Sequence, residues 1–128
     1  VSAKGGVARF TETAAAEFKD KNISVNAIAP GAVNTKFLDD LLSAGPEKSG
    51  GENYEKALRQ KESGGVSPEK AAALCVFLAS EEACGITGKI LSAVWDNYEE
   101  LPKHMDEIKS SDIYNIRRIR PEDRGFKW

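Results

Sequence analysis

The sequence predicts an α/β fold, the C-terminal part of a doubly wound parallel sheet with the order helix, strand, lid, helix, strand and a C-terminal extension. Segments with helical periodicity alternate with two short apolar segments that suit strands buried on both faces. A strand, a helix and a strand in this order imply a right-handed parallel crossover. Two parallel strands leave an open edge, and the first helix implies a preceding strand, so we expect part of a larger sheet.

The composition is that of an ordinary globular chain of 128 residues, with 41% hydrophobic and 30% charged residues. The formal net charge of −2 provides no general attraction to nucleic acid or to a membrane surface. The longest apolar run, 71–79, is far shorter than the ~20 residues that span a bilayer. We therefore expect no nucleic-acid partner and no membrane partner.

The cysteines and the single histidine do not form a metal-binding pattern. Cys75 lies within the apolar run, where a small core residue is expected, and Cys84 lies near the end of the same helix. No CxxC pair is present, and His104 lies in a charged stretch, so we expect no metal site. Two unpaired thiols are compatible with the reducing cytoplasm, where we expect the protein to act.

The first helix and the first strand occupy residues 6–29. Residues 6–21 have amphipathic periodicity, with apolar side chains three and four residues apart. These side chains are Val7, Phe10, Ala14 and Phe18. After a polar turn at Asn22, residues 23–29 suit a buried strand, which Pro30 ends because proline has no amide N–H to donate to a neighbouring strand.

A long excursion, residues 32–66, separates this strand from the next helix. Short helices are expected at 37–45 and 53–62, with a flexible connection at 45–51. Excursions of this length usually have a function, often as a lid.

The clearest helix occupies residues 67–85. Ser67 can cap its free amides, Pro68 suits its first position, and Gly85 is a terminator. The expected buried stripe comprises Ala71, Leu74, Phe77 and Leu78. Residues 89–95 are then expected to form the second short strand.

The order and spacing of these segments resemble one known family. SAKGG leads into the first helix, VNAIAPGAVNT follows it, and SPEKAA, VFLAS and GITGKIL come in turn. Together they resemble the C-terminal half of a classical short-chain dehydrogenase/reductase. The resemblance implies that 1–95 is part of an NAD(P)-binding Rossmann-like domain, that 36–66 is its substrate lid, and that 96–128 is an extension.

The resemblance implies an oxidoreductase that transfers hydride between NAD or NADP and an alcohol or ketone. The family signature is a tyrosine followed four residues later by a lysine. Lys4 matches this lysine, which places the tyrosine one residue before Val1. By resemblance, Lys4 also hydrogen-bonds the ribose hydroxyls of the cofactor.

A lysine beside the tyrosine has a clear chemical role. A phenol with a pKa near 10 is a poor base at neutral pH. An ammonium ~4 Å away, at an effective dielectric constant of ~20, is worth roughly 4 kcal/mol, which corresponds to about three pKa units. The tyrosine can then exchange a proton with a carbinol or carbonyl oxygen.

PGAVNT matches the family's nicotinamide site and lies at a strand end, where ligands bind in open parallel sheets. By resemblance, Pro30 and Gly31 shape the wall beside the ring. The backbone of Val33 and the hydroxyl and amide of Thr35 hold its carboxamide. In the lid, the apolar residues either line a substrate pocket or seat the lid on the core, and the sequence leaves both open. They are Phe37, Leu38, Leu41 and Leu42.

The end of the chain departs from the family. A short helix is expected at 102–110, and the last residues are basic with interspersed aromatic side chains. The basic residues are Arg117, Arg118, Arg120, Arg124 and Lys127. We expect an arm that packs across a neighbouring subunit or over the active site, in preference to a nucleic-acid patch.

Two functions follow from the resemblance. We favour a fragment of an oxidoreductase that forms a dimer or tetramer in its full-length form. The isolated chain is then expected to be inactive, because the tyrosine and the Gly-rich loop of the family would precede Val1. The alternative is a non-catalytic truncated chain that acts as a subunit-interaction module through the helix 6–21 and the arm.

Overall fold

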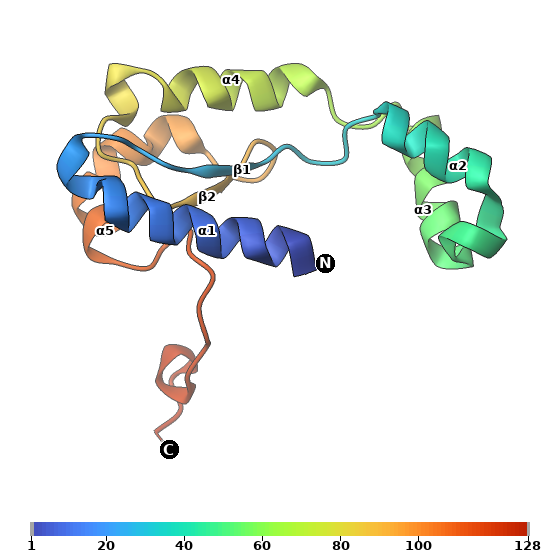
Figure 1. Cartoon of the computed structure of the whole chain (residues 1–128). Coiled ribbons are helices and arrows are strands. Elements are labelled where there is room, and N and C mark those ends of the chain that lie inside the picture. Colours follow the sequence, from blue (N-terminus) through green and yellow to red (C-terminus); the bar gives the residue numbers. More distant parts are fainter. Residues whose placement is uncertain (1, 128) are drawn as a thin grey trace.

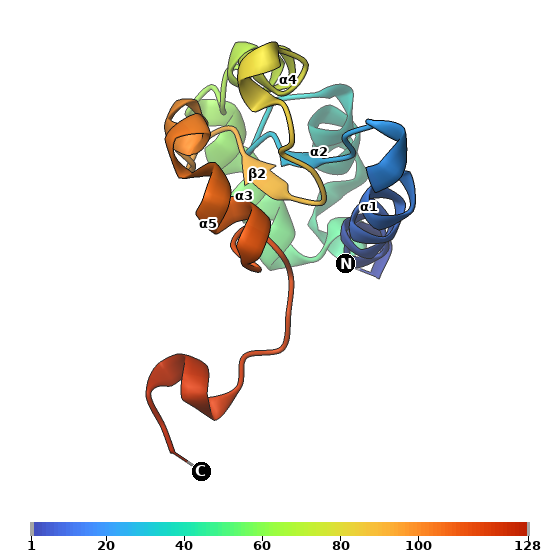
Figure 2. The same cartoon turned by 90° about the vertical axis from the view of Figure 1, so that its left-hand side faces the viewer.

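The computed structural model describes residues 2–127 and has a small parallel sheet enclosed by helices (Figure 1). Strand β1 (Ala27–Ala29) runs parallel to β2 (Ile90–Ser92), with Ala27 opposite Ile90. Helices α1 (Ser2–Phe18) and α5 (Met105–Ser110) lie on one side of the sheet, and α4 (Pro68–Leu78) lies on the other (Figure 2). The predicted mixed α/β class and the parallel strand order are confirmed. Val1 and Trp128, which end two of the predicted segments, lie outside the described residues.

The core lies between α4, β2 and the first part of the C-terminal extension. It consists of Leu74, Phe77, Ala83, Ile86, Leu91, Ala93, Leu101 and Ile108. Leu101 belongs to the 3-10 helix η3 (Tyr98–His104), and the ring of Tyr98 lies 5.2 Å from that of Phe77. The first part of the extension is therefore built into the core, whereas the segment that contains η4 (Pro121–Arg124) projects away from it (Figure 1).

Helix α1 begins at Ser2, four residues earlier than expected, and is followed by the 3-10 turn η1 (Lys19–Lys21). The predicted apolar face is wrong for Val7 and Phe10, which are 58% and 71% exposed, whereas Phe18 is half-buried. The buried side chains are instead small: Ala8, Thr11, Ala14 and Ala15. The helix lies so close to the chain entering β2 that a Cβ on Gly88 would come within 3.3 Å of the Ala15 Cβ. Close approach of this kind requires small residues at the contact.

Both strands are shorter than predicted. Strand β2 ends in a turn, where the Ser92 hydroxyl accepts from the amides of Val94 and Trp95 at 3.2 and 3.1 Å. Before β1, side chains replace part of the regular ladder. The Val25 amide donates to the Thr87 hydroxyl at 3.0 Å. The Asn26 side chain donates to the Ile86 carbonyl at 2.7 Å and accepts from the Lys89 amide at 3.1 Å. The two segments therefore run side by side before the first regular pair.

The excursion after β1 folds into two helices, α2 (Lys36–Ser49) and α3 (Gly51–Glu62). The flexible connection expected at 45–51 is wrong. The chain kinks at Gly45, which has φ 78°, and helical structure resumes at Pro46, where proline suits a first position. The two helices pack on each other and form a hairpin to one side of the sheet (Figure 1).

Helix α4 starts where predicted, because its capping signals are local, but it ends at Leu78 and not at the expected terminator Gly85. The amide and the hydroxyl of Ser80 both donate to the Phe77 carbonyl and turn the chain out of the helix. The Ser67 hydroxyl accepts a hydrogen bond from the Glu69 amide at 3.3 Å. Leu74 and Phe77 are buried, while Ala71 and Leu78 are half-buried. The short 3-10 helix η2 (Glu81–Ala83) follows it.

Cys75 was expected in the core and is exposed, so that expectation is wrong. Its position is next to Leu74, and a step of one residue rotates a side chain by about 100° around a helix. The outer face of α4 therefore also carries apolar side chains, and Val76 is 72% exposed.

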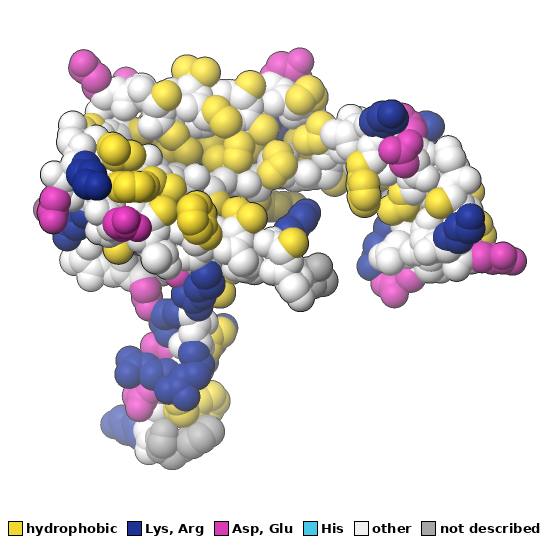
Figure 3. Space-filling view, viewed as in Figure 1, with side chains coloured by type: hydrophobic (Ala, Val, Ile, Leu, Met, Phe, Trp, Pro, Cys, Tyr) yellow, Lys and Arg dark blue, Asp and Glu magenta, His cyan; other side chains and the backbone are white. Residues whose placement is uncertain are grey.

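The open edge of the sheet carries an apolar surface. Within residues 2–127, β1 has β2 as its single strand neighbour. Hydrophobic side chains cover the region between α4 and α1 in the space-filling view (Figure 3). No helix in the described part of the chain is long and apolar enough to cross a membrane.

Candidate functional site

Lys4 and the segment after β1 lie at the same end of the sheet. Helix α1 runs antiparallel to β1, so its first turns are at the carboxyl end of the strand, from which the chain leaves toward the lid (Figure 1). Lys4 is exposed and has no hydrogen-bond or ion-pair partner among residues 2–127. A cation at a helix N-terminus is unfavourable for the helix dipole. Neither a side-chain contact among the described residues nor the helix dipole explains why a lysine occupies this position.

Gly31 brings three parts of this end of the fold together. It has φ 85°, and a Cβ placed on it would come within 2.7 Å of Val94 Cγ2 and 3.2 Å of Val66 Cγ2. Val94 follows β2, and Val66 follows the lid. The Val66 amide also donates to the Ala32 carbonyl at 2.9 Å, so the two ends of the lid are joined beside the end of β1.

The groups expected to hold a carboxamide differ in their availability. Thr35 is exposed and precedes α2, and its hydroxyl makes no capping bond to the described helix. Both backbone groups of Val33 have partners. Its amide donates to the Gly31 carbonyl at 3.0 Å, and its carbonyl accepts from Gln60 Nε2 at 3.3 Å.

Gln60 is a lid residue that the sequence analysis did not identify. Its amide nitrogen also donates to Asn34 Oδ1 at 3.1 Å, so α3 is tied to the turn after β1. An ion pair of 2.8 Å between Lys61 and Asp39 joins α3 to α2. No spacing pattern relates Gln60 to a turn 26 residues earlier, which is why sequence reasoning could not find this contact.

The apolar lid residues serve different roles. Leu38 is buried, Leu41 and Leu42 are half-buried, and Phe37 is 75% exposed. Because α2 and α3 pack on each other, with Leu38 and Ala57 as their buried residues, this apolar face stabilises the hairpin itself. Phe37 and, to a smaller extent, Leu58 are the large apolar side chains of 36–66 that are available to another surface.

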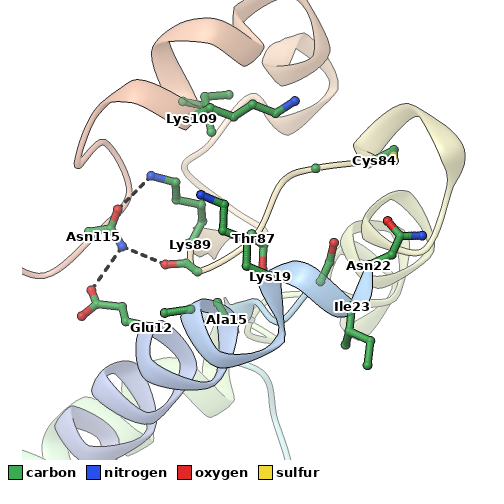
Figure 4. A pocket seen from close by; sticks show the side chains of 15 residues that line it. Glu12, Ala15, Lys19, Asn22, Ile23, Cys84, Thr87, Lys89, Lys109 and Asn115 are labelled. Atoms are coloured by element: carbon green, nitrogen blue, oxygen red, sulfur yellow. Dashed lines mark hydrogen bonds between the residues drawn. The ribbon is translucent and has the colours of Figure 1, made fainter.

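A cavity of about 550 Å³ lies at the opposite end of the sheet (Figure 4). Its walls come from the second half of α1, the segments that enter β1 and β2, and α5. The cavity lies at the amino ends of the strands, whereas Lys4 and Gly31 lie at the carboxyl ends. The cavity is therefore separate from the site built around Lys4.

A hydrogen-bond network lies along one side of this cavity (Figure 4). Lys89 is 6% exposed, and its ammonium donates to the Ser111 carbonyl at 3.0 Å and to Asn115 Oδ1 at 2.8 Å. Asn115 Nδ2 donates to the Gly88 carbonyl at 2.7 Å and to Glu12 Oε1 at 3.2 Å. The network joins three regions that are distant in sequence, and sequence analysis missed it for that reason.

Burial and charge affect the titratable groups of the network. Burial lowers the pKa of Lys89, and the nearby carboxylates of Asp112 and Glu12 oppose that shift. Burial raises the pKa of Glu12, but hydrogen bonds from Arg9 and Asn115 outweigh it and leave that pKa below its usual value. Within residues 2–127, no group of His, Cys, Asp and Glu side chains is arranged to hold a metal ion.

Comparison with known families gives one match over most of the chain. The family model described as enoyl-(acyl carrier protein) reductase matches residues 1–93. This region includes α1, both strands, the lid and α4. No solved structure matched the chain.

Curated relatives match the same region. The short-chain reductase protein NovJ of Streptomyces niveus is 39% identical over 92 residues, which is 69% of this chain and 34% of the relative. The 3beta-hydroxysteroid dehydrogenase 1 of Eggerthella lenta is 39% identical over 95 residues, 70% of this chain and 33% of the relative. The 3-oxoacyl-(acyl-carrier-protein) reductase FabG of Thermotoga maritima is 37% identical over 91 residues, 70% of this chain and 34% of the relative. The chain thus spans about a third of the length of these relatives.

Proposed function

Because this chain belongs to the short-chain dehydrogenase/reductase family, we propose that it is part of an NAD(P)-dependent oxidoreductase that acts on an alcohol or ketone. The observation that carries the proposal is the position of Lys4. It is an exposed lysine without a partner among the described residues, in the first turns of α1, at the carboxyl end of the strand that leads into PGAVNT. The name of the Eggerthella lenta relative, a hydroxysteroid dehydrogenase, supports an alcohol or ketone without selecting one.

The chain's own residues would hold the cofactor at this end of the sheet. The donor set fits in part, since the Lys4 ammonium and the Thr35 hydroxyl are exposed and suited to ribose hydroxyls and to a carboxamide. The Val33 carbonyl accepts from Gln60 at one of its two lone pairs, so a carboxamide N–H would share or compete for this oxygen with the lid. When bound, the cofactor supplies a nicotinamide ring that accepts or donates hydride.

In this proposal Lys4 has two tasks. It hydrogen-bonds the ribose and so orients the nicotinamide. Its positive charge also favours the ionised form of a tyrosine one helical turn away and lowers the pKa of that phenol. The tyrosine would occupy the position before Val1, and it would exchange a proton with the substrate oxygen.

We further propose that the 128 residues by themselves do not catalyse the reaction. They contain no tyrosine four residues before Lys4 and no Gly-rich loop to hold a pyrophosphate. The apolar band along the open edge of β1 supports the proposal that further strands of the sheet pack there in the whole enzyme (Figure 3).

The test uses the enzyme that contains this chain together with its upstream residues. We expect NAD(P)H-dependent reduction of a ketone from a panel, and Lys4→Met to lower kcat/KM by at least about a hundredfold, the scale of losing a positioned charged group. Lys21→Met is the matched control, because Lys21 is an exposed lysine beyond the other end of α1. Equal activity of the two variants would exclude Lys4 from the reaction.

The second candidate function is a subunit-interaction module, favoured by the exposed Val7 and Phe10 on α1. Two large apolar side chains one turn apart on a helix suit a helix-packing contact with another subunit. Light scattering after gel filtration tests this function. We expect oligomers of the 128-residue chain that Phe10→Glu dissociates, whereas the control Glu17→Lys leaves them intact. A wild-type chain that is monomeric at micromolar concentration rejects the module.

A further inference from the structure

We propose that the cavity at the amino ends of the strands is a binding site for a small phosphate-bearing anion. We call it the lysine pocket, because ammonium groups from three separate elements line it (Figure 4). Lys19 comes from the turn after α1, Lys89 directly precedes β2, and Lys109 lies on α5. The site does not depend on the oxidoreductase proposal.

The charge of the lysine pocket is positive in a chain whose net charge is −2. One carboxylate lines the cavity with its three lysines, that of Glu12, and the carboxylate of Asp112 also acts on Lys89. The Glu12 carboxylate is already engaged, since it forms an ion pair with Arg9 and accepts from Asn115 and from the amide of Ile116. The carboxylates of Glu12 and Asp112 offset part of the charge of the three lysines, and an anion in the cavity would balance the rest.

Lys89 supplies an incompletely satisfied donor. An ammonium has three N–H groups, and two of those on Lys89 have acceptors, on Ser111 and Asn115. The third has no acceptor among residues 2–127. Because Lys89 is 6% exposed, this group is largely removed from bulk water. An anionic oxygen in the pocket would complete its hydrogen bonds.

The chemistry and size of the lysine pocket favour phosphate. Lysine acts as a compact point charge that suits phosphate oxygens from several directions. A volume of about 550 Å³ is suited to a small molecule that carries a phosphate. Burial lowers the pKa of Lys89, and a bound anion would oppose this shift.

The test measures binding of inorganic pyrophosphate to the 128-residue chain by two-dimensional amide NMR at low ionic strength. We expect saturable shifts at Lys19, Gly85, Gly88 and Lys109, which line the pocket. Lys19→Gln and Lys109→Gln should each weaken binding by at least about threefold, as expected for removal of one partly screened charge. The matched control is Lys103→Gln, which removes an exposed lysine of η3 outside the pocket.

Two results would overturn the proposal. One is the absence of saturable shifts at millimolar pyrophosphate. The other is equal weakening by all three substitutions, because that would reflect the overall charge of the chain.

Thermal unfolding provides a second measurement that does not require replacement of the buried lysine. A ligand that binds the folded state raises Tm. We expect pyrophosphate to raise Tm of the wild-type chain more than sodium chloride of the same ionic strength does. The double variant Lys19→Gln/Lys109→Gln should lose this difference, and an undiminished rise in that variant contradicts the site.

Discussion

Asn115 donates a hydrogen bond to the carboxylate of Glu12 at 3.2 Å and thereby joins the C-terminal segment to the first helix, 103 residues earlier in the chain. The same side chain accepts from the buried ammonium of Lys89. A single side-chain amide thus satisfies groups on α1 and on the segment entering β2. The C-terminal segment is held to the sheet by this contact as well as by the bond from the Ile90 amide to the Tyr114 carbonyl at 2.9 Å.

Replacing this amide should destabilise the chain. Asn115→Ala leaves the Lys89 ammonium with one acceptor, and we expect a loss of about 1–3 kcal/mol in the free energy of unfolding. Urea denaturation of the wild-type and variant chains measures this loss. Asn53→Ala is the control, because Asn53 makes one exposed bond, to the Ser49 carbonyl. Equal losses in the two variants would mean that the network adds no stability.

Gly31 offers a test of close packing at the lid root. Gly31 and Gly45 both have positive φ, 85° and 78°, but a Cβ on Gly45 meets nothing within 4 Å. Both alanine variants introduce backbone strain of about 1 kcal/mol or more, and Gly31→Ala adds an overlap with Val94. We expect Gly31→Ala to lower Tm further than Gly45→Ala does. A smaller effect at Gly31 would contradict the packing described.

Acid should open the turn at the end of the chain. A hydrogen bond from Arg117 and another from the Arg120 amide lower the pKa of Asp123 from 3.8 to about 2. The folded pKa is below the unfolded one, so the stabilisation is present above pH 3.8 and is lost as the pH falls through about 2.

Amide chemical shifts of η4 measured against pH report this loss. We expect the Arg120 amide to shift with a midpoint near 2, and the Asp123→Asn variant to lack this transition. A midpoint near the ordinary aspartate value would show that the Arg117 contact is absent in solution.

Gln60 should influence cofactor binding in the whole enzyme. Its bond to the Val33 carbonyl occupies a group that we propose for the nicotinamide carboxamide. Gln60→Ala frees this carbonyl, and we expect KM for the cofactor to fall by about twofold to fivefold, the scale of one modest hydrogen bond, with kcat nearly unchanged. Lys56→Ala is the control on the same helix. A higher KM for the cofactor in Gln60→Ala would mean that the contact assists binding.

Local signals account for the parts of the fold that were predicted. Helix α4 was identified from a serine cap, a proline at the first position and a regular apolar stripe, all within a few residues. The two strands were identified as parallel because a helix connects them. Their lengths were overestimated because the side chains of Asn26 and Thr87 replace part of the ladder before β1, and because the chain turns at Ser92 after β2. A sequence pattern does not report such bonds.

Tertiary contacts determine the features of the fold that the sequence pattern does not predict. The buried face of α1 follows from its close approach to Gly88, which selects alanine and excludes Phe10. The lysine pocket is formed by segments that meet only after the sheet has folded. By contrast, the prediction for Lys4 depends on its spacing within SAKGG and its place at the start of the helix, which are local features, and it stays a prediction.

The central claim is that Lys4 belongs to the catalytic pair of a short-chain dehydrogenase/reductase. The most direct measurement is to sequence the coding region immediately upstream of Val1. The account predicts a tyrosine codon directly before Val1 and a Gly-rich βαβ segment farther upstream. Any other residue at that position would leave Lys4 without its partner and would contradict the catalytic role.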